Sequence, residues 1–453
     1  MQAVDVRGAR ITVLGAGVSG RSIASLAARL GAGVFVSDGG SVTDEARSFL
    51  ESNSIQFESG GHTERVFHCD MAVVGSGFPP SAEVVGALLG RGISIIGELD
   101  FVMPHLNGKI IGITGSNGKT TTTSLTAHLL ASAGGRVTTV GNIGSPVADA
   151  AGTKYDFIVA ELSSFQLHWA DRIELDAAVV TNLAPDHIDW HGSYDNYVRA
   201  KTKILSFTGQ NGFTIIQDRD SVTLGRTKAA QYRLSWDKSA ADGELILNSL
   251  SRTCSLGEKF LFGFDNTRLL GSHNLENTAM SMAVAELSGI SANTALEALR
   301  SFVAPPHRCS LVLERGGVRY VDDSKGTNIA ATVAALSSIE GRKVVILGGK
   351  GKGEDYSQLA GPLGIFAKSA ILMGEASSDI ALALDASGYG SYSVVSGMEE
   401  AVSRASMEAA PGEVVLLSPA CTSWDMYKNY GERGDHFARL VRKLGEDENE
   451  GIR

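Results

Sequence analysis

The run Gly115-Ser116-Asn117-Gly118-Lys119-Thr120 has the residue types and spacing of a loop that binds phosphate groups. An apolar segment, residues 109–114, precedes it, and a threonine-rich segment suited to a helix follows. In such a loop the glycines let backbone N–H groups turn toward phosphate oxygens, and the helix start adds its positive dipole end. The lysine reaches the β- and γ-phosphates, and the Thr120 hydroxyl ligates Mg²⁺. The run therefore predicts a nucleoside triphosphate site, although Ile113 stands where the longer form of the pattern has glycine. An ordinary glycine-rich turn is the alternative.

Metal-ligating side chains follow the next apolar segments. Residues 157–160 are apolar and lead into Glu161, at the strand end where a parallel sheet presents a metal ligand beside a phosphate loop. The segment 182–191 contains Asp186 and His187, which suit a divalent cation but equally suit hydrogen bonds within a loop. Lys201 lies on the predicted helix that follows, where a solvated basic face is the alternative interpretation.

A second glycine-rich turn lies near the N-terminus. The run Gly15-Ala-Gly17-Val-Ser-Gly20 follows an apolar segment and opens a predicted helix, and Asp38 comes further along the chain. This is a Rossmann-type fingerprint, in which the helix start binds a diphosphate. The fingerprint does not single out a nicotinamide cofactor, because the same turn accepts any pyrophosphate. A tight turn with only a structural purpose also fits it.

The last third of the chain contains charged and hydroxyl side chains beside predicted strands. Arg308 is suited to neutralising a transferring phosphoryl group, and Asp323 to holding the ribose or adenine end of a nucleotide. The acid-rich segment around Asp323 can also be an ordinary turn, in which Asp is common. The glycine loop 348–353 offers lysines to a carboxylate, and residues 418–423 offer hydroxyls at a helix start.

Composition excludes several classes of protein. The 453 residues are 43% hydrophobic and 20% charged, with a formal net charge of −10 and no Lys/Arg-rich run, so the footprint of a nucleic-acid binder is missing. The four cysteines form no CxxC pair, which argues against a disulfide framework or structural zinc. No apolar run is long enough to span a membrane. We expect a cytoplasmic protein with no membrane and no nucleic-acid partner.

Alternating β-branched and Ala/Leu-rich segments predict an α/β fold. Three blocks are expected, each built on a mostly parallel sheet with flanking helices. Their predicted boundaries are 1–97, 98–303 and 304–453. A more polar stretch, 210–270, reads as an antiparallel insertion in the second block, with residues 213–216 as one of its strands.

Taken together, these motifs resemble those of the Mur ligase family over almost the whole chain. Short motifs occur in the family's order at residues 115–120, 141–144, 161–166, 182–187, 271–277 and 307–308. The segments 322–328 and 418–434 resemble the branch that adds D-glutamate, and the Asp-Asn-Pro-Arg signature of the diaminopimelate- or lysine-adding branch is absent. Trp424 and Tyr430 depart from the residues usual in the second segment, and we expect them to change packing more than chemistry.

The resemblance implies an activity and a set of ligands. The expected reaction adds D-glutamate to UDP-N-acetylmuramoyl-L-alanine with ATP, through an acyl-phosphate, in peptidoglycan precursor synthesis. The expected cofactor is Mg²⁺, with two ions. The three blocks, in chain order, are expected to be a Rossmann-like domain for the UDP substrate, a P-loop ATPase-like domain for ATP and a Rossmann-like domain for the amino acid. We expect the protein to be a monomer.

The resemblance implies roles for individual residues wherever a motif of this sequence matches a motif of the family. The catalytic residues implied are Lys119, Glu161, His187 and Lys201; Thr120, Glu161 and His187 bind metal, joined by Lys201 when it is carbamylated. ATP is expected at Gly115, Ser116, Asn117, Gly118, Lys119, Thr120, Thr121, Asn274, Arg308 and Asp323. The UDP substrate is expected at Gly15, Gly17, Val18, Ser19, Asp38, Gly77 and Asn142. D-Glutamate is expected at Lys325, Thr327, Lys352, Ser423 and Tyr430.

Rival functions differ in what they leave unexplained. A folylpolyglutamate-type ligase shares the ATP core but is not expected to carry the 322–328 and 418–434 segments. A nicotinamide-dependent dehydrogenase accounts for Gly15 to Gly20 but leaves Lys119 and Thr120 without a role. A non-catalytic nucleotide sensor leaves Glu161 and His187 without one.

Overall fold

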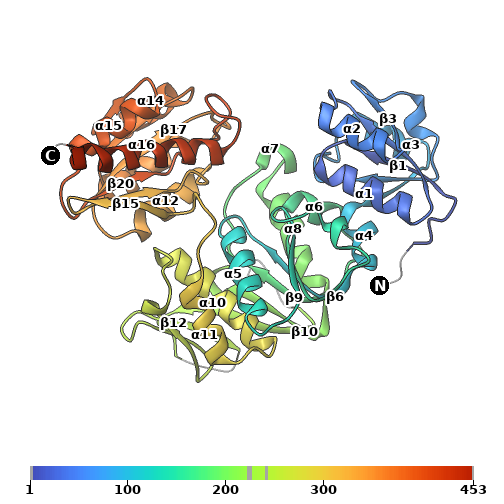
Figure 1. The fold of residues 1–453 in the computed structure, drawn as a ribbon, viewed down its shortest axis with the longest axis horizontal. Helices are drawn as coiled ribbons and strands as arrows, with labels where there is room; N and C mark the ends of the chain where they lie inside the picture. The colour runs from blue at the N-terminus through green and yellow to red at the C-terminus, as the bar shows by residue number, and fades with distance from the viewer. Residues whose placement is uncertain (1–3, 222–226, 240–242, 451–453) are drawn as a thin grey trace. The chain divides into compact units, whose positions relative to one another are not determined.

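The structure is a computed structural model that describes residues 4–221, 227–239 and 243–450. Contacts divide the chain into two compact units, residues 1–266 with 277–301, and residues 267–276 with 302–453. Each unit is built on mostly parallel sheets flanked by helices, which confirms the predicted α/β class (Figure 1). The boundaries 97 and 303 stay a prediction.

The first sheet is parallel and has the strand order β3-β2-β1-β4-β5. Apolar and polar residues do not alternate along these strands, because helices cover the sheet. Central strands such as β1 are therefore buried along most of their length. The order reverses between β1 and β4, and ligands bind at such a switch point. The elements are β1 (Arg10–Leu14), α1 (Val18–Arg29), β2 (Gly33–Asp38), α2 (Asp44–Ser52), β3 (Gln56–Ser59), β4 (Met71–Val74), α3 (Glu83–Gly90) and β5 (Ser94–Gly97).

The second sheet has nine strands in the order β14-β13-β12-β11-β10-β9-β6-β8-β7. Strands β6 to β9 are parallel, and β6 lies between β8 and β9, so the residues that end these three strands meet at one edge. The elements are β6 (Asn107–Thr114), β7 (Val137–Gly141), β8 (Lys154–Glu161), β9 (Leu175–Val180), β10 (Thr208–Gln217), β11 (Ala230–Trp236), β12 (Glu244–Asn248), β13 (Thr253–Leu256) and β14 (Lys259–Gly263).

The predicted antiparallel insertion at 210–270 is partly wrong. The segment 213–216 belongs to β10, which pairs in parallel with both β9 and β11. Among the described residues of this stretch, the antiparallel pairs are β12–β13 and β13–β14. The polar composition of this stretch comes from strands at the edge of the same sheet rather than from a separate insertion.

Helices of the first unit place the site residues of the second sheet. They are α4 (Glu98–Val102), α5 (Lys119–Ala131), α6 (Ser164–Trp169), α7 (Ile188–His191), α8 (Tyr194–Ser206) and α11 (Ala292–Ser301). Helix α5 leaves directly from the loop after β6, and α6 begins with a capping box made by Ser163 and Gln166. Helix α10 (Ser272–Leu287) precedes α11.

The third sheet has the order β15-β16-β20-β17-β18-β19, parallel except for the β15–β16 hairpin. Segments rich in apolar residues at 343–347, 370–373 and 413–417 predict strands, and the structure has a strand at each of them. The elements are β15 (Ser310–Arg315), β16 (Val318–Asp322), α12 (Ile329–Ser338), β17 (Lys343–Gly348), α13 (Ala360–Phe366), β18 (Ala367–Met373), α14 (Ser377–Ala386), β19 (Tyr392–Val394), α15 (Met398–Glu408), β20 (Val414–Leu417) and α16 (Tyr430–Glu450).

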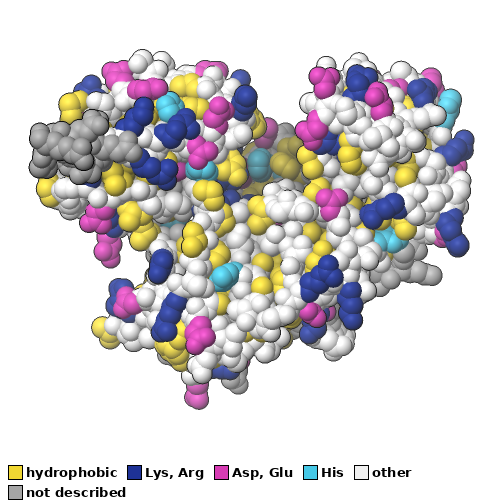
Figure 2. All heavy atoms as spheres, viewed as in Figure 1, with side chains coloured by type: hydrophobic (Ala, Val, Ile, Leu, Met, Phe, Trp, Pro, Cys, Tyr) yellow, Lys and Arg dark blue, Asp and Glu magenta, His cyan; other side chains and the backbone are white. Residues whose placement is uncertain are grey.

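The surface carries charges of both signs. Figure 2 shows Lys and Arg side chains interspersed with Asp and Glu over the visible face of each unit. Among the described residues, no helix combines the length and the hydropathy needed to cross a membrane.

Candidate active site

The phosphate loop follows β6 and depends on two glycines. Gly115 has φ of 143° and Gly118 has φ of 82°, a region that L side chains rarely adopt. A Cβ on Gly115 would lie 1.9 Å from Thr181 Oγ1, and one on Gly118 would lie 2.3 Å from Asn277 Oδ1. The loop therefore has the left-handed turns and close neighbours that require glycine, which agrees with a cradle of backbone N–H groups at the start of α5.

Neighbouring side chains hold this loop in shape. Asn182 accepts a hydrogen bond from the Asn117 N–H at 3.0 Å and donates one to the Asn117 carbonyl at 2.9 Å. Lys119 Nζ donates to the carbonyl oxygens of Gly115 and Ser116, both at 2.8 Å. The lysine thus lies folded over its own loop, where an ammonium can bind phosphate oxygens.

Lys201 lies against the same loop from α8. Its side chain is 2% exposed, and Nζ donates to the Gly115 carbonyl at 2.7 Å. Burial lowers the pKa of Lys201 well below its ordinary value, and the Lys119 charge lowers it further, whereas Asp186 and Glu161 oppose the shift. A buried lysine with a low pKa holds a reactive neutral amine.

Glu161 ends β8 next to Lys201 and is 3% exposed. Its Oε2 is buried without a hydrogen-bond partner among the described residues. An ionised carboxylate oxygen left in this state is costly unless a cation pairs with it. The Asn142 N–H donates to the Glu161 carbonyl at 3.0 Å, so the predicted substrate residue Asn142 lies beside the predicted metal ligand.

His187 precedes α7 in a left-handed conformation, with φ of 52°. Its Nε2 is 3.5 Å from Asp186 Oδ2, and its ring contacts Phe165 edge-on with centroids 4.7 Å apart. The described residues contain no group of three or more His, Cys, Asp or Glu that could hold a metal ion. The residues present fit Mg²⁺ only if other oxygens, such as the Thr120 hydroxyl and nucleotide phosphates, complete the ligand set.

The N-terminal turn has the geometry of a dinucleotide-type site. Gly15 has φ of 94°, and a Cβ on Gly20 would lie 2.0 Å from the Gly15 carbonyl oxygen, so α1 approaches the turn closely. Gly17 caps α1, Val18 is exposed and Ser19 follows in the first turn. Asp38 accepts hydrogen bonds from the Ala16 N–H at 2.7 Å and the Gly40 N–H at 2.8 Å. Asp38 therefore fastens the turn to the end of β2.

In the other unit, Asp323 is buried among protein groups. Its carboxylate accepts from Ser418 Oγ at 2.7 Å and from the Cys309 N–H at 3.3 Å. Burial raises the pKa of Asp323 to about 7, although the Ser418 hydrogen bond opposes the shift. These contacts give Asp323 a structural role, and its expected role at the ribose of ATP stays a prediction.

Arg308 lies between two strained residues, His307 with φ of 65° and Cys309 with φ of 47°. His307 Nδ1 is 2.7 Å from Asp322 Oδ2, and this hydrogen bond raises the pKa of His307. Asn274, the other ATP residue predicted in this unit, donates from Nδ2 to the Leu270 carbonyl at 2.8 Å. The His307–Asp322 pair fixes the backbone that presents Arg308.

The predicted D-glutamate residues are brought together in part. Lys325 Nζ lies 4.0 Å from the centre of the Tyr430 ring. Ser423 is 2% exposed, and the Thr327 N–H donates to the Lys325 carbonyl.

Three residues that position the site were missed as site residues. Arg433 is fully buried and donates to Ser324 Oγ and to the carbonyls of Ser324, Cys421 and Thr422. Tyr197, on α8, lies with its hydroxyl 2.7 Å from Ser116 Oγ. Asn182 holds the phosphate loop. Asn182 and Arg433 stand inside recognised motifs, whereas Tyr197 carries no signal except its place one helical turn before Lys201.

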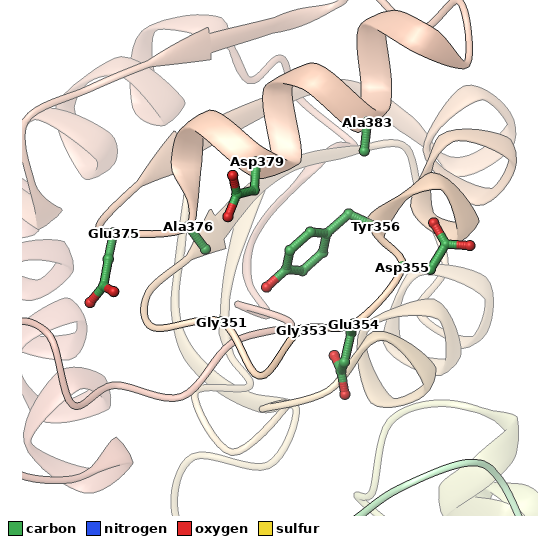
Figure 3. A pocket seen from close by; sticks show the side chains of 9 residues that line it. All are labelled: Gly351, Gly353, Glu354, Asp355, Tyr356, Glu375, Ala376, Asp379 and Ala383. Carbon is green, nitrogen blue, oxygen red and sulfur yellow. The ribbon is translucent and has the colours of Figure 1, made fainter. Parts of the chain in front are cut away.

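A pocket of about 410 Å³ opens beside the loop that carries Lys352. Figure 3 shows Tyr356 in it, with Asp379 and Glu354 near its ring, and Asp355 and Glu375 add two further carboxylates to the lining. Carboxylates repel a dicarboxylate ligand. We therefore do not place D-glutamate in this pocket.

Family models match most of the chain. The MurD N-terminal domain matches residues 10–84, the Mur ligase middle domain residues 113–285, and the Mur ligase, glutamate ligase domain residues 307–421. A relative from Pelotomaculum thermopropionicum is 36% identical over 96% of this chain and 98% of its own length. The chain belongs to the Mur ligase family.

The relatives of this Mur ligase carry one name. Both the Pelotomaculum protein and a Thermotoga maritima protein, 34% identical over 97% of this chain and 100% of its own, are named UDP-N-acetylmuramoylalanine–D-glutamate ligase. Solved structures share the fold at 18% identity, covering 96% of this chain and 100% of theirs. They are a pseudomurein peptide ligase type C from Methanothermus fervidus, with a TM-score of 0.59, and a UDP-N-acetylmuramate-alanine ligase from Thermotoga maritima, with a TM-score of 0.58.

Proposed function

We infer that this Mur ligase is an ATP-dependent enzyme that joins D-glutamate to UDP-N-acetylmuramoyl-L-alanine in peptidoglycan precursor synthesis. Full-length similarity to the D-glutamate ligases supports the substrates. The observation that carries the chemistry is the edge of the second sheet, where Lys119, Lys201 and Glu161 surround the phosphate loop. That arrangement is suited to activating a carboxylate with a nucleotide.

The reaction proceeds in two steps. The alanine carboxylate of the UDP substrate attacks the γ-phosphorus of ATP, and ADP leaves from an acyl-phosphate. The amine of D-glutamate then attacks the acyl carbon, and phosphate leaves as the amide forms. Negative charge on the transferring phosphoryl group requires cations that are already in place, and Lys119 on the phosphate loop is suited to that role.

Mg²⁺ would supply further charge neutralisation between phosphate and carboxylate oxygens. We propose two ions, with Thr120, Glu161 and His187 as ligands. The buried Glu161 oxygen that lacks a partner supports this role. The low pKa of Lys201 supports its carbamylation, since the neutral amine attacks CO₂ and the resulting carbamate carries a negative charge suited to a second ion.

The UDP substrate is proposed to start at the N-terminal turn, with Gly15, Gly17, Val18 and Ser19 at its diphosphate. A pocket of about 570 Å³ lies in the same unit. Its walls include Pro80 and Ser81 from the loop after β4, and Trp190 and His191 from α7, which follows His187. Because it adjoins both the Gly77 loop and α7, this pocket is a suitable place for the muramoyl part of the substrate.

The test is phosphate release from ATP with amino acids of both chiralities. Phosphate should appear only when UDP-N-acetylmuramoyl-L-alanine and D-glutamate are both present. Release with a folate substrate, or with any amino acid regardless of identity, would overturn the proposal. A titration with NADH, followed by its fluorescence, tests the dehydrogenase alternative and should show no binding at micromolar protein.

Lys201→Ala tests the carbamate, because a short carboxylic acid can replace a missing anion but not a missing ammonium. Activity should be lost and partly restored by acetate, whereas full activity without acetate would remove the carbamate role.

We further propose that the enzyme acts as a monomer in the cytoplasm, where its nucleotide substrates are made.

A further inference from the structure

A hydrogen-bonded network joins the ends of β2 and β3 beside the N-terminal turn. Ser37, which is fully buried, donates from Oγ to Glu58 Oε1 at 2.7 Å. His62 Nδ1 is 2.7 Å from the same Ser37 Oγ. Thr63 donates to Glu58 from both its N–H and its hydroxyl. None of these residues belongs to the glycine fingerprint.

The network fixes which nitrogen of His62 carries the proton. Burial opposes ionisation of Glu58, but the hydrogen bonds from Thr63 and Ser37 lower its pKa overall. Glu58 is therefore a carboxylate and takes the single hydroxyl proton of Ser37. Ser37 Oγ can then only accept from His62, so Nδ1 bears a hydrogen, and in the neutral imidazole Nε2 keeps a lone pair. Among the described residues, His62 Nε2 has no hydrogen-bond partner.

The free nitrogen lies at the ligand-binding edge of the sheet. Nε2 is 3.1 Å from where a Cβ on Gly39 would stand, so a side chain at that position would crowd it. The His62 ring lies 6.0 Å, centroid to centroid, from the ring of Phe78. Phe78 in turn approaches the Gly15 turn, with Cε2 3.2 Å from the Gly15 Cβ position. His62 and Phe78 thus lie beside the turn proposed to bind the substrate diphosphate.

We propose that His62 Nε2 accepts a hydrogen bond from N3–H of the uracil ring and so determines the preference for uridine over cytidine substrates. This inference rests on the proposed function, which supplies the UDP group. Uracil carries a donor at N3, whereas cytosine presents an acceptor there. Ser37 and Glu58 hold the Nε2 lone pair of His62 in place, so it can accept from the N3–H of uracil but repels the N3 lone pair of cytosine. A site built to hydrogen-bond one group rejects an analogue that lacks it.

Two substitutions test the roles of the two ring nitrogens of His62 separately. In His62→Asn the side-chain amide reaches the position of Nδ1 and can still bond Ser37, but nothing replaces Nε2. In His62→Gln the amide reaches the position of Nε2. The matched control is His68→Asn, because His68 is exposed and outside the network.

The experiment measures kcat and KM with UDP- and CDP-N-acetylmuramoyl-L-alanine, after thermal melts have shown which variants are folded. Wild type should prefer the uridine substrate. His62→Asn should raise KM for that substrate about tenfold and leave kcat and the cytidine KM nearly unchanged, since one hydrogen bond accounts for roughly a factor of ten. His62→Gln should retain more of the preference, and His68→Asn all of it.

Several results would overturn the assignment. Equal losses with both substrates would place His62 at the ribose or phosphate instead. An unchanged preference in His62→Asn, or equal effects of the Asn and Gln variants, would remove its role in reading the base. If His62→Asn does not fold, Gly39→Ala takes its place, and an unchanged preference there would also count against the proposal. Failure of the proposed function is distinct, because wild type would then release no phosphate with the uridine substrate and D-glutamate.

Discussion

The buried carboxyl of Asp323 makes a prediction about stability and pH. Its pKa is raised from 3.8 to about 7, chiefly by burial, so the folded chain holds a proton that the unfolded chain releases at a lower pH. Between those values the folded state binds more protons than the unfolded state. Stability contributed by this group is therefore fully present below pH 3.8 and is lost as pH rises through 7.

The size of the effect follows from the two pKa values. Each pKa unit corresponds to about 1.4 kcal/mol, and integrating from pH 8 to pH 5 gives a gain of about 3 kcal/mol in wild type on the acid side. In Asp323→Asn the amide cannot ionise but keeps an acceptor for the Cys309 N–H and lies within reach of Ser418. The stability of this variant should therefore lack the gain of about 3 kcal/mol between pH 8 and pH 5.

The assay is hydrogen exchange of the peptide that contains β20, measured over a urea series at pH 5 and pH 8 in the full chain. It reports opening of the strand that precedes Ser418 and avoids treating a two-unit protein as a single transition. Asp379→Asn is the matched control, because Asp379 is exposed in the same unit. If Asp323→Asn and wild type show the same change between the two pH values, Asp323 is ionised in the folded chain and the reasoning is refuted.

Three further substitutions probe the two units. Gly118→Ala puts a Cβ 2.3 Å from Asn277 Oδ1 at a φ of 82°, so ATP affinity measured by calorimetry should fall at least tenfold; unchanged affinity would mean that the loop relaxes freely. Lys201→Arg keeps a cation at the loop but cannot form a carbamate, and it should cost at least a hundredfold in kcat; near-normal turnover would contradict this. Arg433→Met removes the buried donors to Ser324 and should destabilise the second unit by about 3 kcal/mol in urea unfolding, whereas Arg442→Met, on the next turns of α16, should change little.

Local patterns predicted the sheet elements well because burial makes their sequences unusual. Parallel strands covered on both faces read as continuous apolar runs, so β6, β17 and β20 could be placed from composition alone. Composition alone could not predict whether neighbouring strands pair in parallel or antiparallel. Residues 213–216 look the same in a parallel and an antiparallel sheet, and only the neighbouring β9 and β11 decide between them.

The site shows the same division between local and long-range information. The phosphate loop was visible because its glycines and lysine are consecutive. Tyr197 was not, because its contact with Ser116 joins residues 81 positions apart. Asp323 was predicted to bind ATP, but its sequence position in a turn does not show that its carboxylate accepts hydrogen bonds from Ser418 and from the Cys309 N–H.

The Gly115 carbonyl links the two lysines of the candidate active site. Lys119 Nζ donates to it at 2.8 Å and Lys201 Nζ at 2.7 Å, so one backbone oxygen serves both side chains. A carbamate on Lys201 would keep one N–H on Nζ but add two negatively charged oxygens, which a carbonyl oxygen repels. The carbamate oxygens must therefore point away from the Gly115 carbonyl, and the buried Glu161 oxygen is an acceptor that can share a cation with them. Lys119 donates to the carbonyls of Gly115 and Ser116, where incoming phosphate oxygens can replace them as its acceptors.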